Sequence, residues 1–514
     1  MFETAELDLK LSKSEFARQE PETRTELLQL QRDLNRLRIP AIVLIHGMDG
    51  SGRGDVLNRL HEWLDARYLL VYAPGDPSEE ESQRPEYWRH WMHLPARGQI
   101  GLCLGSWYSP AMAARAYGAW SDDRLDAAMA RARRFEQALV DDGMLVIKLW
   151  LHLTKKQQKR RFRRIEGTPH PRWPVTQTDW KHHALYGEFR KVASRVIRTT
   201  STAGAPWTVI EAGDWRYRDI AVVKHLIQRV RQRVSEAERA TGAGASSAAR
   251  EDADQDSPSV PTWSGRTDAF TERTILDTLD LGLALNRQTY EERLAAGQAR
   301  LNRLAHKVAR KPLGVVVVFQ GWDAAGKGGA IRRVAQALDA RDCRIVPVAA
   351  PTDEERAHHY LWRFWRHLPR LGKTTLFDRS WYGRVLVERV ERYATTAEWQ
   401  RAFHEINDFE EQLVGFGIVV VKFWLHISKD EQLRRFQQRE STPWKRHKIT
   451  EEDYRNRERW SDYEVAVSEM IGHTSTEYAP WTLVEGNDKP FARVKVLETL
   501  CGAVEKALAA HASR

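Results

Sequence analysis

The stretch Val315-Val-Val-Val-Phe-Gln-Gly-Trp-Asp-Ala-Ala-Gly-Lys-Gly-Gly329 decides the fold of this chain. Its first five residues are apolar and mostly β-branched, which predicts a strand buried on both faces of a sheet. The helix-forming segment Ala330-Ile-Arg-Arg-Val-Ala-Gln-Ala-Leu338 follows the glycines. A strand, a glycine-rich turn and a helix in this order predict a phosphate-binding loop, or P-loop.

The spacing of the P-loop matches GxxxxGK. Glycines allow backbone N–H groups to close around a phosphate, and Lys327 would neutralise its charge. Gly328 stands where a Ser or Thr usually binds Mg²⁺, so that hydroxyl is missing. A glycine-rich turn with a surface lysine is the alternative, which the flanking strand and helix disfavour. The expected phosphate-binding glycines are Gly321, Gly326, Gly328 and Gly329.

A second motif, Leu376-Phe-Asp-Arg-Ser-Trp-Tyr-Gly-Arg384, places Asp378 and Arg379 at the end of another predicted strand. Open α/β sheets bind ligands at this edge. Asp378 is placed to hold Mg²⁺, and Arg379 could clamp a phosphate. With no hydroxyl at Gly328, Asp323 becomes a second candidate metal ligand. A turn salt bridge at Asp378-Arg379, and a loop-capping role for Asp323, remain alternatives.

Basic residues follow the predicted strand Ile418–Trp424. The segment from Lys429 to Arg439 has a helical pattern and runs into the basic turn Thr442-Pro-Trp-Lys-Arg-His-Lys448. A basic lid closes over phosphates and excludes water in nucleoside-phosphate kinases. A merely solvated face is the alternative. The candidate lid residues are Arg434, Arg435, Arg439, Lys445, Arg446 and Lys448.

The chain contains the same unit twice. An offset of 274 pairs Ser106-Trp107-Tyr108 with Ser380-Trp381-Tyr382, and the register never slips. In each copy, short Val/Ile-rich runs alternate with segments long enough for crossover helices. We therefore predict an α/β fold of two tandem P-loop kinase-like domains, each a parallel sheet with helices on both faces and a helical lid. The expected ranges are residues 1–234, a flexible linker over 235–268, and residues 269–514.

A helix is expected ahead of the first strand in each copy, over Leu27–Leu37 and Leu301–Val308. In the second copy the expected strands are Val315–Phe319, Lys373–Phe377, Ile418–Trp424 and Trp481–Val484.

The first copy has lost the residues that carry chemistry in the second. Its loop reads Gly47-Met-Asp-Gly-Ser-Gly-Arg-Gly-Asp55, so Arg53 stands opposite Lys327 and Asp55 opposite Gly329. An acid at the start of that helix would repel phosphate. Leu104-Gly105 stands opposite Asp378-Arg379, and Pro171 and Pro174 replace two lid lysines. We predict that this copy is catalytically inactive and serves as structure or as an extension of the binding surface.

The bulk composition limits the cellular setting. The net charge of +10 over 514 residues is compatible with a polyanionic partner or simply with a basic surface. Three widely separated cysteines argue against a zinc site or a disulfide framework. The acidic N-terminus does not match a signal peptide, and the longest apolar runs are strand-sized. We expect a cytoplasmic protein without a membrane partner; a homo-oligomer is compatible with the sequence.

Taken together, the P-loop, Phe377-Asp-Arg-Ser-Trp-Tyr-Gly-Arg384, Lys422-Phe-Trp-Leu-His-Ile-Ser-Lys429 and Ala479-Pro-Trp481 resemble polyphosphate kinase 2. The tandem form resembles its two-domain class, the polyphosphate:AMP phosphotransferases. This resemblance implies transfer of a phosphoryl group from inorganic polyphosphate to AMP, giving ADP, with Mg²⁺ and without nucleic acid. The implied essential residues are Lys327, Asp323, Asp378 and Arg379. It also implies polyphosphate contacts at Arg332 and Arg333, and nucleotide contacts at Tyr382, Arg384 and Glu388.

Three other functions remain open on the sequence. The same fold could phosphorylate ADP to ATP from polyphosphate, or use ATP as the donor for a nucleotide or small molecule. A non-catalytic polyanion or nucleic-acid binder would fit the charge and the 20 Trp, but it leaves Lys327 and Asp378-Arg379 without a purpose.

Overall fold

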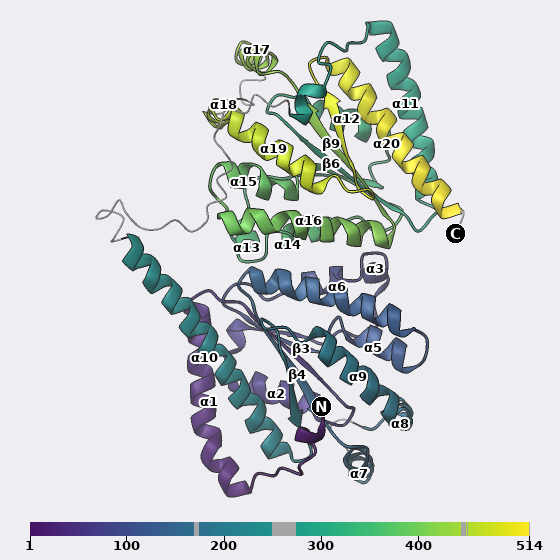
Figure 1. The fold of residues 1–514 in the computed structure, drawn as a ribbon. Coiled ribbons are helices and arrows are strands. Elements are labelled where there is room, and N and C mark those ends of the chain that lie inside the picture. The colour runs from purple at the N-terminus through teal and green to yellow at the C-terminus, as the bar shows by residue number, and fades with distance from the viewer. Residues whose placement is uncertain (169–173, 249–273, 444–448, 450, 513–514) are drawn as a thin grey trace. The chain divides into compact units, whose positions relative to one another are not determined.

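The computed structural model describes residues 1–168, 174–248, 274–443, 449 and 451–512 (Figure 1). They form two compact units. The N-terminal unit is built mainly from the described residues within 1–77 and 89–248, and the C-terminal unit mainly from those within 274–355 and 360–512.

The elements of the first half of the chain alternate between strands and helices. In chain order they are η1 (Glu3–Ala5), α1 (Lys13–Arg36), β1 (Ala41–Gly47), α2 (Arg53–Trp63), η2 (Ala66–Tyr68), β2 (Leu69–Tyr72), α3 (Glu79–Ser82), α4 (Trp88–Met92), β3 (Ile100–Leu104), α5 (Ser109–Ala116), α6 (Asp122–Asp141), β4 (Leu145–His152), α7 (Lys155–Glu166), α8 (Gln177–Ala184), α9 (Tyr186–Thr200), β5 (Trp207–Glu211) and α10 (Trp215–Ala248).

The second half follows the same plan. Its elements are η3 (Ile275–Thr278), α11 (Arg287–Val308), β6 (Gly314–Gly321), α12 (Lys327–Ala335), β7 (Cys343–Pro347), α13 (Asp353–Arg356), α14 (Trp362–Trp365), β8 (Thr374–Asp378), η4 (Trp381–Val385), α15 (Val387–Val390), α16 (Thr396–Phe416), β9 (Ile418–His426), α17 (Lys429–Glu440), α18 (Glu451–Glu458), α19 (Trp460–Thr474), β10 (Trp481–Glu485) and α20 (Lys489–Ala512).

Each unit contains one parallel five-stranded sheet. The strand order is β2-β3-β1-β4-β5 in the first and β7-β8-β6-β9-β10 in the second, so the two topologies are the same. The first strand of each sheet lies in the middle, and the chain crosses from one side of it to the other. In such sheets the carboxyl ends of the strands on either side of this point form the ligand crevice. The predicted α/β tandem fold is confirmed.

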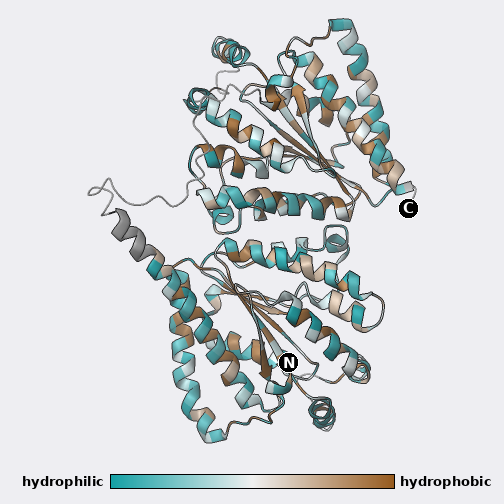
Figure 2. Ribbon diagram, in the orientation of Figure 1, coloured by the Kyte–Doolittle hydropathy of each residue, from teal (hydrophilic) through white to brown (hydrophobic). Residues whose placement is uncertain are grey.

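The core of the C-terminal unit is the central strand pair. Val316 to Phe319 on β6 are fully buried, and β9 is buried along most of its length. Figure 2 shows brown, apolar ribbon along the strands at the centre of the unit and mixed teal and brown ribbon on the helices around them. The four predicted strands are present, but β7 was not predicted. It is an edge strand that buries only Val346 and exposes Ile345, so it lacks the continuous apolar run of a central strand.

Helices cover both faces of the sheet in the C-terminal unit. Figure 1 shows α11, α12 and α20 on one face and α16 and α19 on the other. The helices expected before each first strand are present but begin earlier than predicted. α1 starts at Lys13, where Ser12 and Glu15 form a capping box. That S-x-x-E signal precedes a polar first turn, so the apolar spacing alone did not reveal it.

The region expected to be a linker begins differently. Helix α10 continues past residue 234 and ends at Ala248. Among the residues of α10 whose burial is described, Val230 and Val234 are the last buried apolar ones, and the segment Ser235-Glu-Ala-Glu-Arg-Ala240 after them is rich in residues of high helix propensity, which favours continuation of the helix beyond its packed part. The remainder of the expected linker lies outside the described residues. In the part of the chain that the structure describes, no helix combines the length and apolarity needed to cross a membrane.

Candidate active site

The P-loop follows β6 as predicted, and two of its glycines adopt backbone angles that favour glycine. The φ angle is +146° at Gly321 and +111° at Gly326. A Cβ atom on Gly321 would lie 2.4 Å from the carbonyl oxygen of Leu425 on β9. At Gly328, by contrast, a Cβ would meet no described atom within 4 Å. The loop is therefore packed tightly against β9, while the first turn of α12 stays open.

Lys327 folds back over the loop that carries it. Its Nζ donates hydrogen bonds to the carbonyl oxygens of Gly321 (2.7 Å) and Trp322 (3.0 Å). Burial lowers the pKa of Lys327, and the neighbouring Asp323 carboxylate opposes this effect. An anion bound in the loop would favour the charged ammonium further, because opposite charges attract strongly in a partly buried site.

Asp323 is the most constrained acid of the site. Its Oδ1 accepts a hydrogen bond from Arg379 Nη2 (3.1 Å) and its Oδ2 accepts one from Asn456 Nδ2 (3.1 Å). Gln432 Nε2 donates to its backbone oxygen at 3.2 Å. Burial alone would raise the pKa of Asp323, but Lys327 and Arg379 outweigh it, so the pKa lies below the usual value. The carboxylate is therefore ionised at neutral pH.

Asp378 and Arg379 lie beside the P-loop, as the sequence predicts. Asp378 is the last residue of β8 and is in register with Phe319 on β6. Among the described residues its carboxylate has no hydrogen bond or ion pair within 4 Å. Arg379 has a φ of +65°, which is uncommon for a residue with a side chain, and its N–H donates to the Phe319 oxygen (3.0 Å). Strain of this kind is concentrated at functional sites and aims the side chain toward Asp323.

The arginines of α12 lie on the first turns after the loop. Arg332 is exposed and its Nε donates to the Gly328 oxygen (3.3 Å), while Arg333 is half-buried. Sequence reasoning missed a further cation here. The Arg493 guanidinium on α20 lies 3.4 Å from where a Cβ on Gly329 would be. Lys489, on the same helix, has a pKa lowered to about 8, mainly by burial and next by the charge of Arg435. Both follow β10, and the rule that strand ends line the ligand edge could have identified them.

The predicted lid residues do not share one environment. Arg434 is exposed and pairs with both oxygens of Glu431 at 2.7 Å. Arg439 lies in the last turn of α17, and its charge contributes to lowering the pKa of Lys327. Lys445, Arg446 and Lys448 lie outside the described residues.

Arg435 departs from the expectation that it would contact phosphate. It is 2% exposed, and its guanidinium donates to four backbone oxygens, two in the P-loop and two after β10. These acceptors are Ala324 (2.9 Å), Ala325 (3.0 Å), Gly486 (2.7 Å) and Asn487 (2.9 Å). A buried cation needs such partners, and here they make Arg435 a clamp on the loop instead of a lid residue.

Tyr382 also differs from its expected nucleotide-binding role. It is fully buried, its hydroxyl donates to Glu410 Oε1 (2.7 Å), and Lys422 Nζ donates to that hydroxyl (2.8 Å). Its place three residues after Arg379 predicts a position in the site, but the chain turns into the core at Trp381, which is also fully buried. Tyr382 thus anchors the segment after β8 in the core.

The other two predicted nucleotide residues are placed together. Arg384 Nε lies 3.2 Å from Glu388 Oε2, and its guanidinium stacks over the Tyr360 ring with 4.5 Å to the centroid. Burial raises the pKa of Glu388, and Arg384 opposes this shift.

A cavity opens between the P-loop, η4 and α18. Trp322 forms one wall and stacks on Trp460, with ring centroids 3.7 Å apart. Asn456, which sequence reasoning missed, links this wall to Asp323. The cavity is lined by Gln320, Gly321, Trp322, Asp323, Arg379, Gly383, Leu386, Val387, Trp424, Gln432, Glu452, Asn456 and Tyr463. It therefore joins the phosphate-binding loop to an aromatic and apolar surface.

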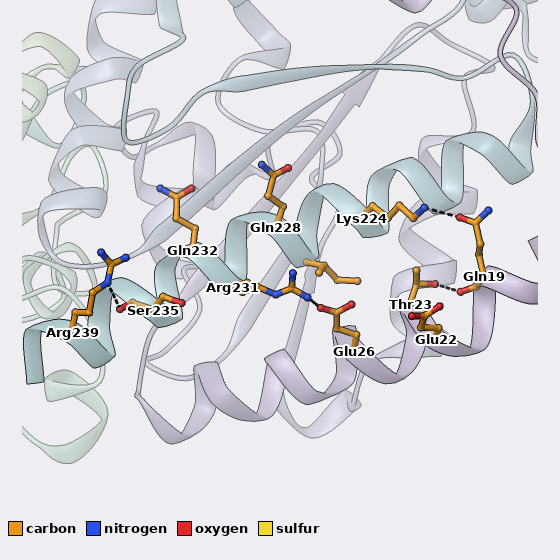
Figure 3. Close-up of a pocket in the computed structure, with 11 residues that line it drawn as sticks. Gln19, Glu22, Thr23, Glu26, Lys224, Gln228, Arg231, Gln232, Ser235 and Arg239 are labelled. Carbon is orange, nitrogen blue, oxygen red and sulfur yellow. Dashed lines mark hydrogen bonds and ion pairs between the residues drawn. The ribbon is translucent and has the colours of Figure 1, made fainter. Parts of the chain in front are cut away.

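A second, larger groove lies between α1 and α10 of the N-terminal unit, away from its P-loop (Figure 3). Its polar side chains bond to one another. Lys224 donates to Gln19 (2.7 Å), Arg231 pairs with Glu26, and Arg239 Nε donates to the Ser235 oxygen (3.1 Å). This self-paired groove offers no converging set of groups for a ligand.

Two regions of the chain, residues 10–238 and 284–512, match the family model described as polyphosphate kinase 2. The chain belongs to the polyphosphate kinase 2 family. Both copies of the repeat match this family, and together they account for most of the sequence.

Full-length relatives agree with the polyphosphate kinase 2 assignment. The chain is 48% identical over 508 residues to a polyphosphate:AMP phosphotransferase of Pseudomonas aeruginosa, with 99% of each chain covered. It is 35% identical over 469 residues to a polyphosphate:AMP phosphotransferase of Acinetobacter johnsonii, covering 89% of this chain and 90% of the relative. A crystal structure described as polyphosphate kinase 2 from Pseudomonas aeruginosa PA01 superposes with a TM-score of 0.85 at 46% identity, covering 99% of both chains.

The two polyphosphate kinase 2 copies differ at the loop. In the N-terminal unit Arg53 Nη2 pairs with Asp49 Oδ1 (2.6 Å). Arg218, only 1% exposed, lies against the loop: its Nη1 donates to the Ser51 oxygen (3.0 Å), and a Cβ on Gly52 would lie 1.7 Å from that nitrogen. The N-terminal loop is thus occupied by the protein's own arginine, whereas at the equivalent Gly326 of the C-terminal loop the nearest atom to a Cβ, Arg435 Nη1, would lie 4.0 Å away.

Proposed function

We propose that this chain is a polyphosphate:AMP phosphotransferase, which transfers the terminal phosphoryl group of inorganic polyphosphate to AMP and yields ADP. One observation carries the proposal: Lys327, Asp323 and the Asp378-Arg379 pair converge at the ends of neighbouring strands in the C-terminal unit. The names of full-length relatives supply the donor and the acceptor.

The residues of the site supply positioning and positive charge, which are most of what phosphoryl transfer requires. An oxygen of the AMP phosphate attacks the terminal phosphorus of the chain, and the bond from that phosphorus to the bridging oxygen breaks. The loop N–H groups and Lys327 stabilise the charge on the transferred group and on the shortened chain. Lys327 exchanges its carbonyl acceptors for phosphate oxygens, and Arg379 is held in reach by Asp323.

The carboxylates fit a magnesium ion. Mg²⁺ is usually bound by one or two carboxylates together with waters and phosphate oxygens, and not by an all-protein cage. Asp378 makes no hydrogen bond or close ion pair among the described residues, although its charge acts on Lys327 and Arg379, and Asp323 is ionised, so these two residues would hold the ion. When bound, Mg²⁺ neutralises phosphate charge and orients the phosphoryl group. Among the described residues, no group of three or more His, Cys, Asp or Glu could hold a metal by itself.

The donor assignment predicts rapid ADP formation from AMP, Mg²⁺ and polyphosphate by the full chain. With ATP in place of polyphosphate, ADP formation should be slower by a large factor. Chromatographic separation of the nucleotides measures both reactions under the same conditions. Efficient phosphorylation of AMP from ATP, with no activity on polyphosphate, would contradict the proposal.

Asp323→Asn should raise the Mg²⁺ concentration needed for half-maximal activity by roughly tenfold or more, because Gly328 offers no hydroxyl to replace the lost charge. The measurement is initial rate against Mg²⁺ at saturating AMP and polyphosphate. Asp339→Asn, which removes a half-buried carboxylate paired with Arg341, is the matched control and should leave the curve unchanged. An unaltered Mg²⁺ dependence in Asp323→Asn would reduce Asp323 to a loop anchor for Arg379 and Asn456.

A further inference from the structure

Helix α7 in the N-terminal unit is far more basic than its counterpart in the C-terminal unit. The twelve residues Lys155–Glu166 contain seven Lys or Arg and one acid. Helix α17, which occupies the same place after β9, contains four Lys or Arg and three acids in Lys429–Glu440. The copy that has lost the catalytic residues has therefore kept or gained positive charge on this helix, although Pro171 and Pro174 replace lid lysines after it.

The charges on α7 face solvent and form no close ion pairs in the described part of the chain, although Arg160 acts at longer range on Asp8 and helps to lower its pKa. Six of its cations are exposed, and none of them forms an ion pair within 4 Å with any residue in the described ranges. They are Lys155, Lys156, Lys159, Arg160, Arg163 and Arg164. In α17, by contrast, Glu431 pairs with both Arg434 and Arg435.

The spacing gathers these charges on one side of the helix. Lys155, Lys159 and Arg163 form one row at four-residue intervals, and residues 156, 160 and 164 form an adjacent row. Successive charges within a row are about 6 Å apart along the axis. Gln158 and Phe162 face the core on the opposite side. The result is a broad basic strip, which we call the α7 strip.

Folding does not explain the α7 strip. Like charges four residues apart destabilise a helix, and lysines in the first turn oppose the helix dipole. The strip also acts on its surroundings: burial, and then Lys155 and Lys159, lowers the pKa of His183 on α8. A feature that costs stability without a structural gain indicates a binding role.

We propose that the α7 strip is an accessory binding site for the polyphosphate chain, separate from the phosphate loop of the C-terminal unit. This inference rests on the proposed donor. Regularly spaced cations with no close ion-pair partner in the described ranges match a flexible linear polyanion, whose binding is driven by the release of its counterions. The strip lies after β4, at the same edge of the sheet as the filled N-terminal loop, so this copy would hold the donor without acting on it.

The test is the triple variant Lys159→Gln, Arg160→Gln, Arg163→Gln in the full chain. A matched control, Lys13→Gln, Arg18→Gln, Arg32→Gln, removes one lysine and two arginines from the exposed surface of α1. The α7 variant should raise the KM for long-chain polyphosphate at least about tenfold at 0.15 M salt, and lower the slope of log KM against log salt by about 2. The KM for AMP, and the KM for tripolyphosphate, which is too short to occupy two sites, should not change.

Each other outcome has a definite meaning. An unchanged KM for long-chain polyphosphate in a folded, active α7 variant overturns the inference, as does an equal rise in the α1 control. If the variant instead loses affinity for a single-stranded RNA oligonucleotide, measured by fluorescence anisotropy, while its polyphosphate KM is kept, the strip is a nucleic-acid surface. Circular dichroism melts should show the variant at least as stable as the unaltered chain, because repulsion is removed. If the unaltered chain does not use polyphosphate as a donor, the proposed function itself is contradicted.

Discussion

Lys327→Ala should abolish ADP formation by the full chain, whereas Arg53→Ala should leave turnover nearly intact. Lys327 lies in a loop with open space at the first turn of α12, and its ammonium is held within the loop by two carbonyl oxygens. Removing one preorganised charge from such a site lowers the rate by roughly 10³-fold. The assay is the initial rate of ADP formation from AMP and polyphosphate.

The equivalent loop in the N-terminal unit has no room for the same chemistry. Arg53 is committed to Asp49, and Arg218 lies against the loop and also pairs with Asp219 at 2.7 Å. Asp55 at the start of α2 adds a negative charge where an anion would have to bind, and Arg161 pairs with it at 2.9 Å. Truncating Arg53 therefore removes a cation from an already filled loop.

The two variants distinguish a chain with one active copy from a chain with two. If activity survives in Lys327→Ala and disappears when Arg53→Ala is added, both copies are enzymes and the filled loop must open during turnover. Loss of activity in Lys327→Ala alone, together with unchanged thermal unfolding, assigns catalysis to the C-terminal unit. Lys311→Ala, an exposed lysine before β6, serves as the control for removal of a lysine from this unit.

The sequence predicted the elements that have strong local signals. Four strands of the C-terminal sheet and the P-loop were predictable, because a continuous Val/Ile run and a GxxxxGK spacing each have one common structural outcome. Edge strand β7 was not, because Ile345 is exposed and Pro347 ends the strand. The length of α10 was not predicted either, because the helix continues through residues that favour helix formation but are not packed against the core.

The roles of individual side chains were harder to predict than their positions. Arg435 and Tyr382 lie in the motifs expected, but one clamps four backbone oxygens and the other is buried against Glu410. A linear motif does not reveal whether a side chain points into the crevice or into the core. Asn456 and Arg493 reach the loop from helices far along the chain. No local pattern identifies Asn456, and Arg493 could be found only from its place after the end of β10.

Lys422→Met should destabilise the C-terminal unit by about 3–5 kcal/mol, the cost expected when one partner of a buried ion pair is removed. Lys422 Nζ and Glu410 Oε2 are 2.7 Å apart, and both side chains are fully buried. Lys422 also donates to the Thr474 oxygen (2.7 Å), and Trp381 donates to Glu410 (3.0 Å). Thermal unfolding should show the midpoint of this unit lowered by roughly 10 °C.

The stability lost in Lys422→Met should be smaller at low pH than at neutral pH. Burial raises the pKa of Glu410, and Lys422 opposes that shift. Without the lysine the folded-state pKa rises further above its unfolded value of about 4.3. A buried carboxyl group with a raised pKa destabilises the folded state at neutral pH, because the unfolded chain ionises it more easily. This cost disappears at low pH, where the group is protonated in both the folded and the unfolded state. The difference in free energy of unfolding between Lys422→Met and the unaltered chain should therefore decrease as the pH falls toward 4.3. Adding Glu410→Gln to the Lys422→Met chain should remove this pH dependence.

The matched variant Lys148→Met distinguishes a structural role from a role in catalysis. Lys148 makes the same bonds in the N-terminal unit, to Glu136 Oε2 and to the Thr200 oxygen, both at 2.7 Å. Each variant should destabilise its own unit by a similar amount. Only Lys422→Met should also lower kcat, because the C-terminal network holds Trp381 and Tyr382, which are separated from Asp378-Arg379 by Ser380 alone. An equal loss of kcat in Lys148→Met would mean that the N-terminal unit contributes to turnover through more than donor binding.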